Sequence, residues 1–121
     1  MIDGMIHRGD IFLVDLSDRT GSEQRGVRPA VVVQNEIGNR HSPTTIICPI
    51  TSRHKSNEIT HVVLTPDDGG IIKDSVVLCE QLLTIDKSRI RRKVGEITNI
   101  QKIMDINAKM LVSLGIGTER S

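Results

Sequence analysis

Short segments rich in β-branched residues, separated by turn residues, make up most of this chain and predict a mainly β fold. The segments that we expect to be strands are 9–16, 28–35, 44–51, 60–65, 74–83 and 92–97. The first of these is apolar on both faces, as in a central strand, and Pro49 near the end of the third predicts a bulge or an edge position. The connections are a long loop at 17–27 and turns at 36–43 and 66–70.

An amphipathic pattern after the last predicted strand indicates a C-terminal helix. We expect the helix to begin at Thr98, with Gln101 in the capping-box position, and to end at Gly115. Its predicted apolar stripe comprises Ile100, Ile103, Met104, Met110, Leu111 and Leu114. Several short strands and one terminal helix together suggest a small, partly open β-barrel.

Composition places the chain among globular proteins. Its 121 residues suit a single domain spanning 1–121, and 37% hydrophobic with 26% charged residues is an ordinary globular balance. No apolar run approaches the roughly 20 residues that cross a bilayer, and the first residues lack the basic and apolar regions of a signal peptide. We therefore expect a cytoplasmic protein with no membrane partner.

The formal net charge of +1 gives no general attraction to nucleic acid, so we expect no DNA binding by the chain on its own. Any RNA binding has to come from local basic clusters. These clusters are Arg19, Arg25 and Arg28, then Arg53, His54 and Lys55, and finally Lys87, Arg89, Arg91, Arg92 and Lys93. The last cluster is typical of a solvated basic turn, and we assign it no role.

The residues that could hold a metal are dispersed. The histidines are His7, His41, His54 and His61, which share no metal-ligand spacing. Cys48 and Cys79 form no C-x-x-C pair, and we interpret both as small buried hydrophobic residues. A nucleophilic serine would need a G-x-S-x-G turn, which the chain lacks. We therefore expect no metal and no cofactor.

Arg28 stands where a glycine-containing polar loop meets a β-branched strand. Pro29 pushes it toward an extended conformation, and its planar donors can bind two phosphate oxygens at once. If strands 28–35 and 44–51 pair as antiparallel neighbours, matching Asn35 with Thr44 places Arg28 opposite Thr51. The alternative, which these residues alone leave open, is a surface arginine before a strand.

This end of the predicted sheet collects further polar residues. The loops 17–27 and 52–58 emerge there, and we expect segment 74–83 to return there with Glu80 and Gln81 at its far end. RNA supplies its own nucleophile, the 2′-OH, so charge stabilisation and proton transfer around one phosphate suffice to cleave it. Arg28, Thr51 and Ser22 could provide both.

At these residues the chain resembles the MazF/PemK toxins of bacterial toxin–antitoxin modules. The motifs that carry the resemblance are Arg-Gly-Asp at 8–10, Asp-Leu-Ser at 15–17, Gly-Ser-Glu-Gln at 21–24, Gly-Val-Arg-Pro at 26–29, Gln-Asn at 34–35, Ile-Thr at 50–51, Asp-Ser at 74–75 and Glu-Gln at 80–81. The resemblance spans residues 6–114 and is closest to the branch found in Gram-positive bacteria.

The resemblance implies an SH3-like barrel of the CcdB/PemK type and a metal-independent endoribonuclease. Such an enzyme cuts single-stranded RNA, usually mRNA, at a short sequence and leaves a 2′,3′-cyclic phosphate and a 5′-hydroxyl. It would be a homodimer neutralised by a small acidic MazE-like antitoxin with a disordered tail. The resemblance assigns catalysis to Arg28 and Thr51, and the residues that we expect to bind RNA are Ser22, Glu23, Gln24, Arg25, Arg53, Glu80 and Gln81.

Two features depart from the family pattern. Arg25 stands where related sequences often have glycine, and Phe12 is the only aromatic residue, so base recognition has to rest on hydrogen bonds and arginine planes. The alternative is a non-enzymatic toxin or binding module on the same barrel, such as a gyrase poison. Those toxins act through a C-terminal tryptophan, whereas this chain has no tryptophan.

Overall fold

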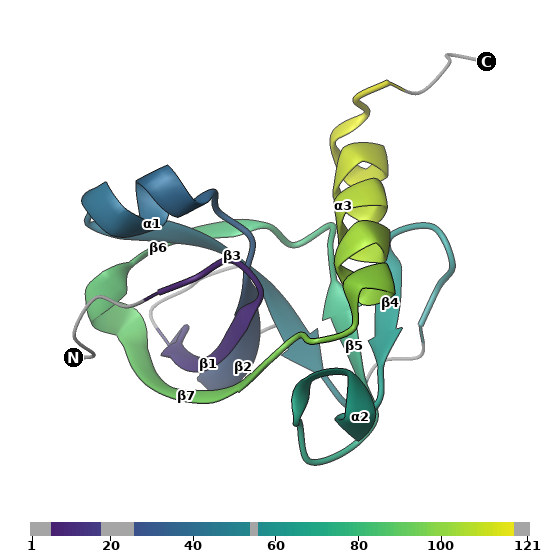
Figure 1. The fold of residues 1–121 in the computed structure, drawn as a ribbon, viewed down its shortest axis with the longest axis horizontal. Coiled ribbons are helices and arrows are strands. Elements are labelled where there is room, and N and C mark those ends of the chain that lie inside the picture. Colours follow the sequence, from purple (N-terminus) through teal and green to yellow (C-terminus); the bar gives the residue numbers. More distant parts are fainter. Residues whose placement is uncertain (1–5, 18–25, 54–55, 118–121) are drawn as a thin grey trace.

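The computed structural model describes residues 6–17, 26–53 and 56–117. Within these ranges the chain forms an antiparallel β-structure with a C-terminal helix (Figure 1). The elements are β1 (Asp10–Asp15), β2 (Val27–Val32), α1 (Glu36–His41), β3 (Thr44–Thr51), β4 (His61–Leu64), α2 (Pro66–Gly69), β5 (Ser75–Leu78), β6 (Leu83–Asp86), the 3-10 helix η1 (Lys87–Arg89), β7 (Ile90–Glu96) and α3 (Ile100–Leu114). The predicted fold class, mainly β with a C-terminal helix, is therefore confirmed.

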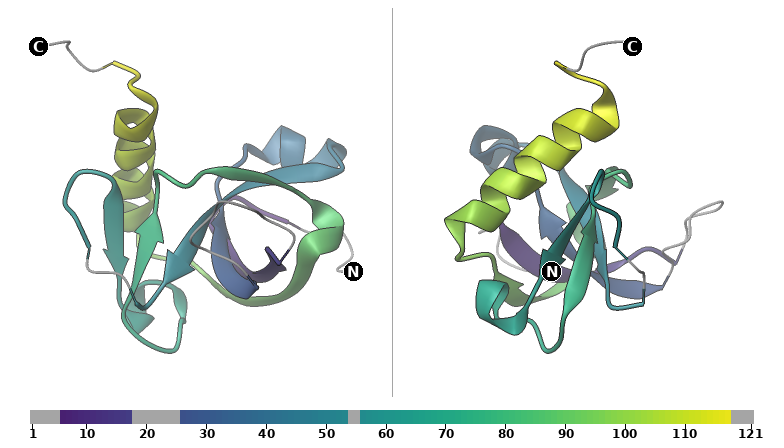
Figure 2. Two further views of the ribbon diagram at one scale, coloured as in Figure 1. Left: turned by 180° about the vertical axis from the view of Figure 1, so that it is seen from behind. Right: turned by 90° about the vertical axis from the view of Figure 1, so that its right-hand side faces the viewer.

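Strand β3 is the centre of the sheet. On one side of β3 lie β2, β1 and β7, and on the other side lie β5 and β4. The order in the sheet is therefore β4-β5-β3-β2-β1-β7. The first half of β3 also pairs with β6, through Thr44–Ile47, while Ile50 and Thr51 pair with β5. Because β3 changes partner along its length, β1, β2, β6 and β7 curl into an open barrel on one side, and β4 and β5 stand beside it (Figure 2).

Pro49 lies opposite Ala30, between the residues of β3 that pair with β6 and those that pair with β5. The predicted bulge or edge position is thus a change of partner inside a central strand. A proline is tolerated there because its missing N–H falls between two ladders.

The apolar residues on the two faces of β1 enter two separate cores. Phe12, Val14 and Leu16 pack inside the barrel with residues of β2, β3, β6 and β7. Ile11 faces the opposite way and packs with residues of β2 to β5 and with Ile106 of α3. This arrangement explains why segment 9–16 has no polar face.

Cys48 and Cys79 are fully buried in the second core, as predicted. The contact with Cys79, followed by burial, raises the pKa of the Cys48 thiol well above its usual value. Both side chains act as core residues here.

Segment 74–83 is two strands, not the single strand that the pattern predicted. β5 ends at Leu78 and β6 begins at Leu83, and the two pair with different halves of β3. The apolar run hides the break because residues on both sides of it are buried or half-buried. The predicted turns at 36–43 and 66–70 contain the short helices α1 and α2.

Helix α3 ends at Gly115, as predicted, and the left-handed φ of 71° explains the glycine. Its N-cap is Asn99 and not Thr98, because the Asn99 side chain accepts a hydrogen bond from the Gln101 backbone N–H. The face that packs toward β4 carries Ile106. The residues of the predicted stripe that point away from the core are Ile100, Met104, Leu111 and Leu114. No helix in the described part of the chain is long and apolar enough to cross a membrane.

The turn after α2 is fixed against β7. A Cβ atom on Gly95 would lie 2.2 Å from the carbonyl oxygen of Gly69, so only glycine permits this approach. Asp68 connects the same turn to α3, because its carboxylate accepts hydrogen bonds from the Thr65 backbone N–H at 2.8 Å and from the Asn99 side chain at 2.9 Å. These contacts set the course of the chain from residue 70 onward, which forms one wall of the site.

Candidate active site

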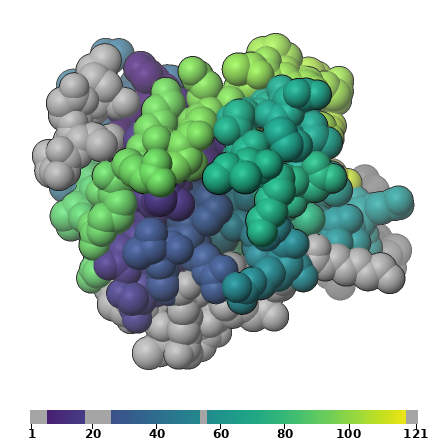
Figure 3. Space-filling model, turned by 90° about the horizontal axis from the view of Figure 1, so that it is seen from below, coloured from purple at the N-terminus to yellow at the C-terminus, as the bar shows by residue number. Residues whose placement is uncertain are grey.

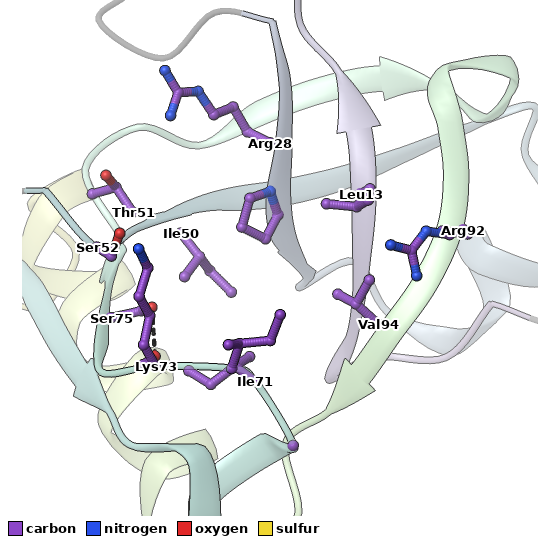
Figure 4. Close-up of a pocket in the computed structure, with 13 residues that line it drawn as sticks. Leu13, Arg28, Ile50, Thr51, Ser52, Ile71, Lys73, Ser75, Arg92 and Val94 are labelled. Atoms are coloured by element: carbon purple, nitrogen blue, oxygen red, sulfur yellow. Dashed lines mark hydrogen bonds between the residues drawn. The ribbon is translucent and has the colours of Figure 1, made fainter.

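A cavity of about 270 Å³ opens where β2 begins and β3 ends (Figure 4). Strands β1, β2 and β7, the end of β3 and the segment between α2 and β5 line it. Of these, β2, the segment after α2 and β7 adjoin on one face of the molecule in the space-filling view (Figure 3). The 13 residues that line it are Leu13, Arg28, Pro29, Ile50, Thr51, Ser52, Gly70, Ile71, Ile72, Lys73, Ser75, Arg92 and Val94.

Arg28 and Thr51 share one side of this cavity, as the sequence predicted (Figure 4). The β2–β3 ladder pairs Ala30 with Pro49 and Val31 with Cys48, which is the predicted register. The same register continued by two residues sets Arg28 opposite Thr51. The structure thus brings the two residues together, whereas their catalytic roles stay a prediction.

The Thr51 side chain is buried and oriented. Only 4% of the residue is exposed, and its Oγ1 accepts a hydrogen bond from the Arg53 backbone N–H at 3.2 Å. A hydroxyl that accepts in this way can still donate its own proton to a ligand. Thr51 is therefore well placed to donate to an oxygen in the cavity.

The cavity wall combines cations, hydroxyls and aliphatic side chains. Arg28, Lys73 and Arg92 supply positive charge, and the described lining contains no Asp, Glu or His. Ser75 donates to the Lys73 carbonyl at 3.0 Å, which holds the turn before β5. This wall suits an anionic ligand that also carries an apolar surface.

Lys73, Ser75 and Arg92 line the cavity although the sequence analysis named none of them as a site residue. Arg92 reaches it because the β1–β7 ladder pairs it with Leu13, which also pairs with Pro29 of β2. In the expected strand 92–97, Arg92 and Val94 share a face. The sequence did not show which strand lies beside them.

Glu80 and Gln81 are not among the lining residues, so their expected position is wrong. β5 is antiparallel to β3 and pairs Val76 with Thr51, so this strand begins at the site and runs away from it. Glu80 instead contacts the His61 ring, with 3.0 Å between Oε2 and Nε2. Whether Glu80 and Gln81 bind RNA stays a prediction.

The remaining predicted RNA-binding residues are Arg53 and the four residues 22–25. Arg53 is exposed two residues after Thr51 and does not line the cavity. Ser22, Glu23, Gln24 and Arg25 lie outside the described residues, as do Arg19, His54 and Lys55. Their assignments stay predictions.

Comparison with known proteins places the chain in a family. Residues 7–114 match the family model described as PemK-like, MazF-like toxin of type II toxin-antitoxin system. The chain belongs to the PemK/MazF toxin family. It is 43% identical to Endoribonuclease MazF of Staphylococcus saprophyticus over 118 residues, which cover 97% of this chain and 98% of that relative.

Solved structures of the family share the fold. The crystal structure of MazF from Deinococcus radiodurans superimposes with a TM-score of 0.79 at 26% identity, over 92% of this chain and 97% of the other. The MazE–MazF crystal structure from the same organism gives a TM-score of 0.73 at 25% identity, over 93% and 97%.

Several family motifs serve the fold and not the cavity. Arg8 donates to the Val33 carbonyl at 2.9 Å and to the Asn107 side chain at 2.6 Å, which ties the start of β1 to β2 and α3. Asn35 caps α1 by accepting from the Gly38 N–H at 2.8 Å. The family resemblance therefore mixes structural residues with residues of the site.

Proposed function

We propose that this chain is a toxin endoribonuclease that cleaves single-stranded RNA at a short sequence. The observation that carries the proposal is the juxtaposition of Arg28 and a buried, oriented Thr51 in a cationic cavity. Membership of a toxin family and 43% identity to a protein named as an endoribonuclease support it. Since its substrate would be cellular RNA, we propose that it acts in the cytoplasm.

The reaction that fits this site is internal transesterification of RNA. The 2′-oxygen attacks the adjacent phosphorus, the bond from phosphorus to the 5′-oxygen breaks, and the 2′-hydroxyl proton ends on the 5′-oxygen. The products are a 2′,3′-cyclic phosphate and a 5′-hydroxyl. Arg28 would stabilise the charge of the pentacoordinate phosphorane or pass the proton, and Thr51 would donate a hydrogen bond to the same phosphate.

We propose that this reaction needs no metal ion. The described residues include no cluster of three or more His, Cys, Asp or Glu side chains that could hold one. The stabilising charge would come from the guanidinium and ammonium groups on the cavity wall.

The test is to incubate the purified protein with a long RNA in excess EDTA and to map the new ends. We expect cleavage at a recurring short sequence, at the same rate after Mg²⁺ is added, with 2′,3′-cyclic phosphate ends. Activity that is lost on chelation and restored by one metal would contradict the mechanism. Cleavage of no RNA, with binding to gyrase instead, would favour the non-enzymatic alternative.

We also propose an acidic antitoxin as the partner that silences the enzyme. The structure described as MazE–MazF from Deinococcus radiodurans, which shares this fold, supports an antitoxin partner. The cavity would attract the acidic side chains of a flexible peptide, and its aliphatic floor would take apolar anchors. A cognate acidic peptide should then compete with RNA, and its affinity should fall as salt rises. Full cleavage with the peptide saturating would refute this control.

Finally, we propose a homodimer. The outward face of α3 exposes 71% of Ile100, 56% of Met104 and 48% of Leu111, which recur at helical spacing. A contiguous apolar face of this kind marks an interaction surface.

A further inference from the structure

We propose that the aliphatic floor of the cavity binds a nucleobase next to the scissile phosphate, and that Arg92 reads the edge of that base. This inference rests on the proposed RNA cleavage, because Arg28 and Thr51 define where the phosphate lies. It adds a residue that determines sequence preference, on a strand to which we assigned no function from the sequence.

Arg92 differs from its basic neighbours in its contacts. Arg91 forms an ion pair with Asp15 at 2.8 Å, Lys93 forms one with Asp10 at 3.2 Å, and Lys87 donates to the Asn39 carbonyl. Arg92 lines the cavity, and among the described residues none forms a hydrogen bond or an ion pair with its side chain. Its donors are therefore available to a ligand in the cavity.

The cations of the cavity lie at two ends. In Figure 4, Lys73 extends toward Thr51 and Ser52, on the side that also holds Arg28, while Arg92 reaches in from β7. The ladders align Arg92 with Leu13 and Leu13 with Pro29 across three neighbouring strands. At roughly 4.8 Å per strand, the backbone of Arg92 is about 10 Å from that of Pro29.

The surface between these ends is aliphatic. It consists of Leu13, Pro29, Ile50, Ile71 and Val94. A phosphate placed there would lose its hydration without gaining donors, whereas the face of a base loses little by leaving water. A phosphate at Arg28, Thr51 and Lys73 therefore leaves the floor to a neighbouring base, whose edge meets Arg92.

The chemistry of arginine specifies the kind of base. A guanidinium donates through two parallel N–H groups, so it prefers an edge with two adjacent acceptors, such as O6 and N7 of guanine. Loss of such a bidentate contact changes discrimination roughly tenfold to a hundredfold at that base, whereas loss of a phosphate contact weakens all sequences alike.

The experiment compares cleavage of a randomised RNA pool by the wild type, Arg92→Gln, Arg92→Lys, Lys73→Gln and Arg91→Gln. We expect Arg92→Gln to relax the preference at one position beside the cut by about tenfold or more, and Arg92→Lys to relax it as well because lysine lacks the planar fork. Lys73→Gln should slow cleavage of every sequence by a similar factor and reduce its salt dependence. Arg91→Gln removes the same charge from the adjacent residue, which does not line the cavity, and should leave the preference unchanged.

An unchanged preference in both Arg92 variants, or an equal loss at every site, would overturn the inference. The same proteins are also titrated with short RNAs that carry a 2′-deoxy nucleotide at the cut, which prevents cleavage, and that differ only in the base that Arg92 would contact. This titration measures binding alone. If the wild type cuts no RNA, the proposed function fails, and the titration still decides the inference. Discrimination that is lost with Arg92 supports it, and equal binding of all bases by the wild type refutes it.

Discussion

Arg28 and Thr51 line the same side of the cavity because they lie on β2 and β3, which are antiparallel neighbours in the sheet and consecutive strands in the chain. The register of this pair determines which residues face each other. The pair could therefore be expected from neighbouring segments of the sequence, whereas Arg92 could not, because its neighbour Leu13 is far away in the chain. Glu80 was misplaced for a related reason: β5 begins beside Thr51 and runs away from the site, and this direction depends on a pairing with β3 that nothing local reveals.

The carboxylate of Asp68 holds the turn after α2, and the chain that follows this turn lines the cavity. The Thr65 backbone N–H, and then the Asn99 side chain, keep the pKa of Asp68 below its usual range. A lowered folded pKa means that the stabilisation is fully present above the unfolded pKa of about 3.9 and is lost as the pH falls through the folded value.

We therefore predict that Asp68→Asn lowers the free energy of unfolding by about 2 kcal/mol at pH 7, as expected for lost hydrogen bonds to a charged group. The difference from the wild type should begin to shrink below about pH 4, where Asp68 takes up a proton in the unfolded chain while it stays ionised in the folded one. Urea denaturation at pH 7 and pH 3 measures both values. Asp67→Asn, at an exposed neighbouring residue, is the control, and a gap that stays constant with pH would contradict this role.

At the scale of elements, the strands were easier to predict than the faces of the helix. The existence and end of α3 follow from its periodicity and from Gly115, but the predicted stripe merges two apolar faces. One face, with Met110 of the stripe and with Ile106, which the stripe omitted, packs against the second core, and the other face, with Met104 and Leu111, is exposed. Periodicity reveals that a residue is apolar, and only the packing reveals what covers it.

The exposed face of α3 yields a prediction about assembly. Leu111→Glu places a charge in the middle of the proposed dimer interface, so it should shift the protein from dimer to monomer at micromolar concentration. Sedimentation equilibrium measures the shift. Gln101→Glu adds the same charge at an exposed polar position of the same helix and should leave the dimer intact. A wild-type protein that sediments only as a 13.4 kDa species would contradict the proposal.

In the whole molecule, the change of partner along β3 explains why the barrel and the cavity lie next to each other. Its first half closes the barrel through β6, and its second half pairs with β5, so Thr51 lies where the two parts diverge. The predicted barrel class is right because many short strands and one helix have few other ways to bury their apolar faces. The strand order was beyond prediction, because it depends on pairings between distant segments.

We propose that Arg28 and Thr51 act together on one phosphate. The most direct test is the single-turnover rate of RNA cleavage by Arg28→Ala, Thr51→Ala and the double variant, with Arg40→Ala, an exposed arginine on α1, as the control. Each single substitution should slow cleavage by about 100-fold or more, the double variant should be little slower than the worse single one, and Arg40→Ala should cut normally. Folded single variants that cleave within a few-fold of the wild-type rate would contradict the claim.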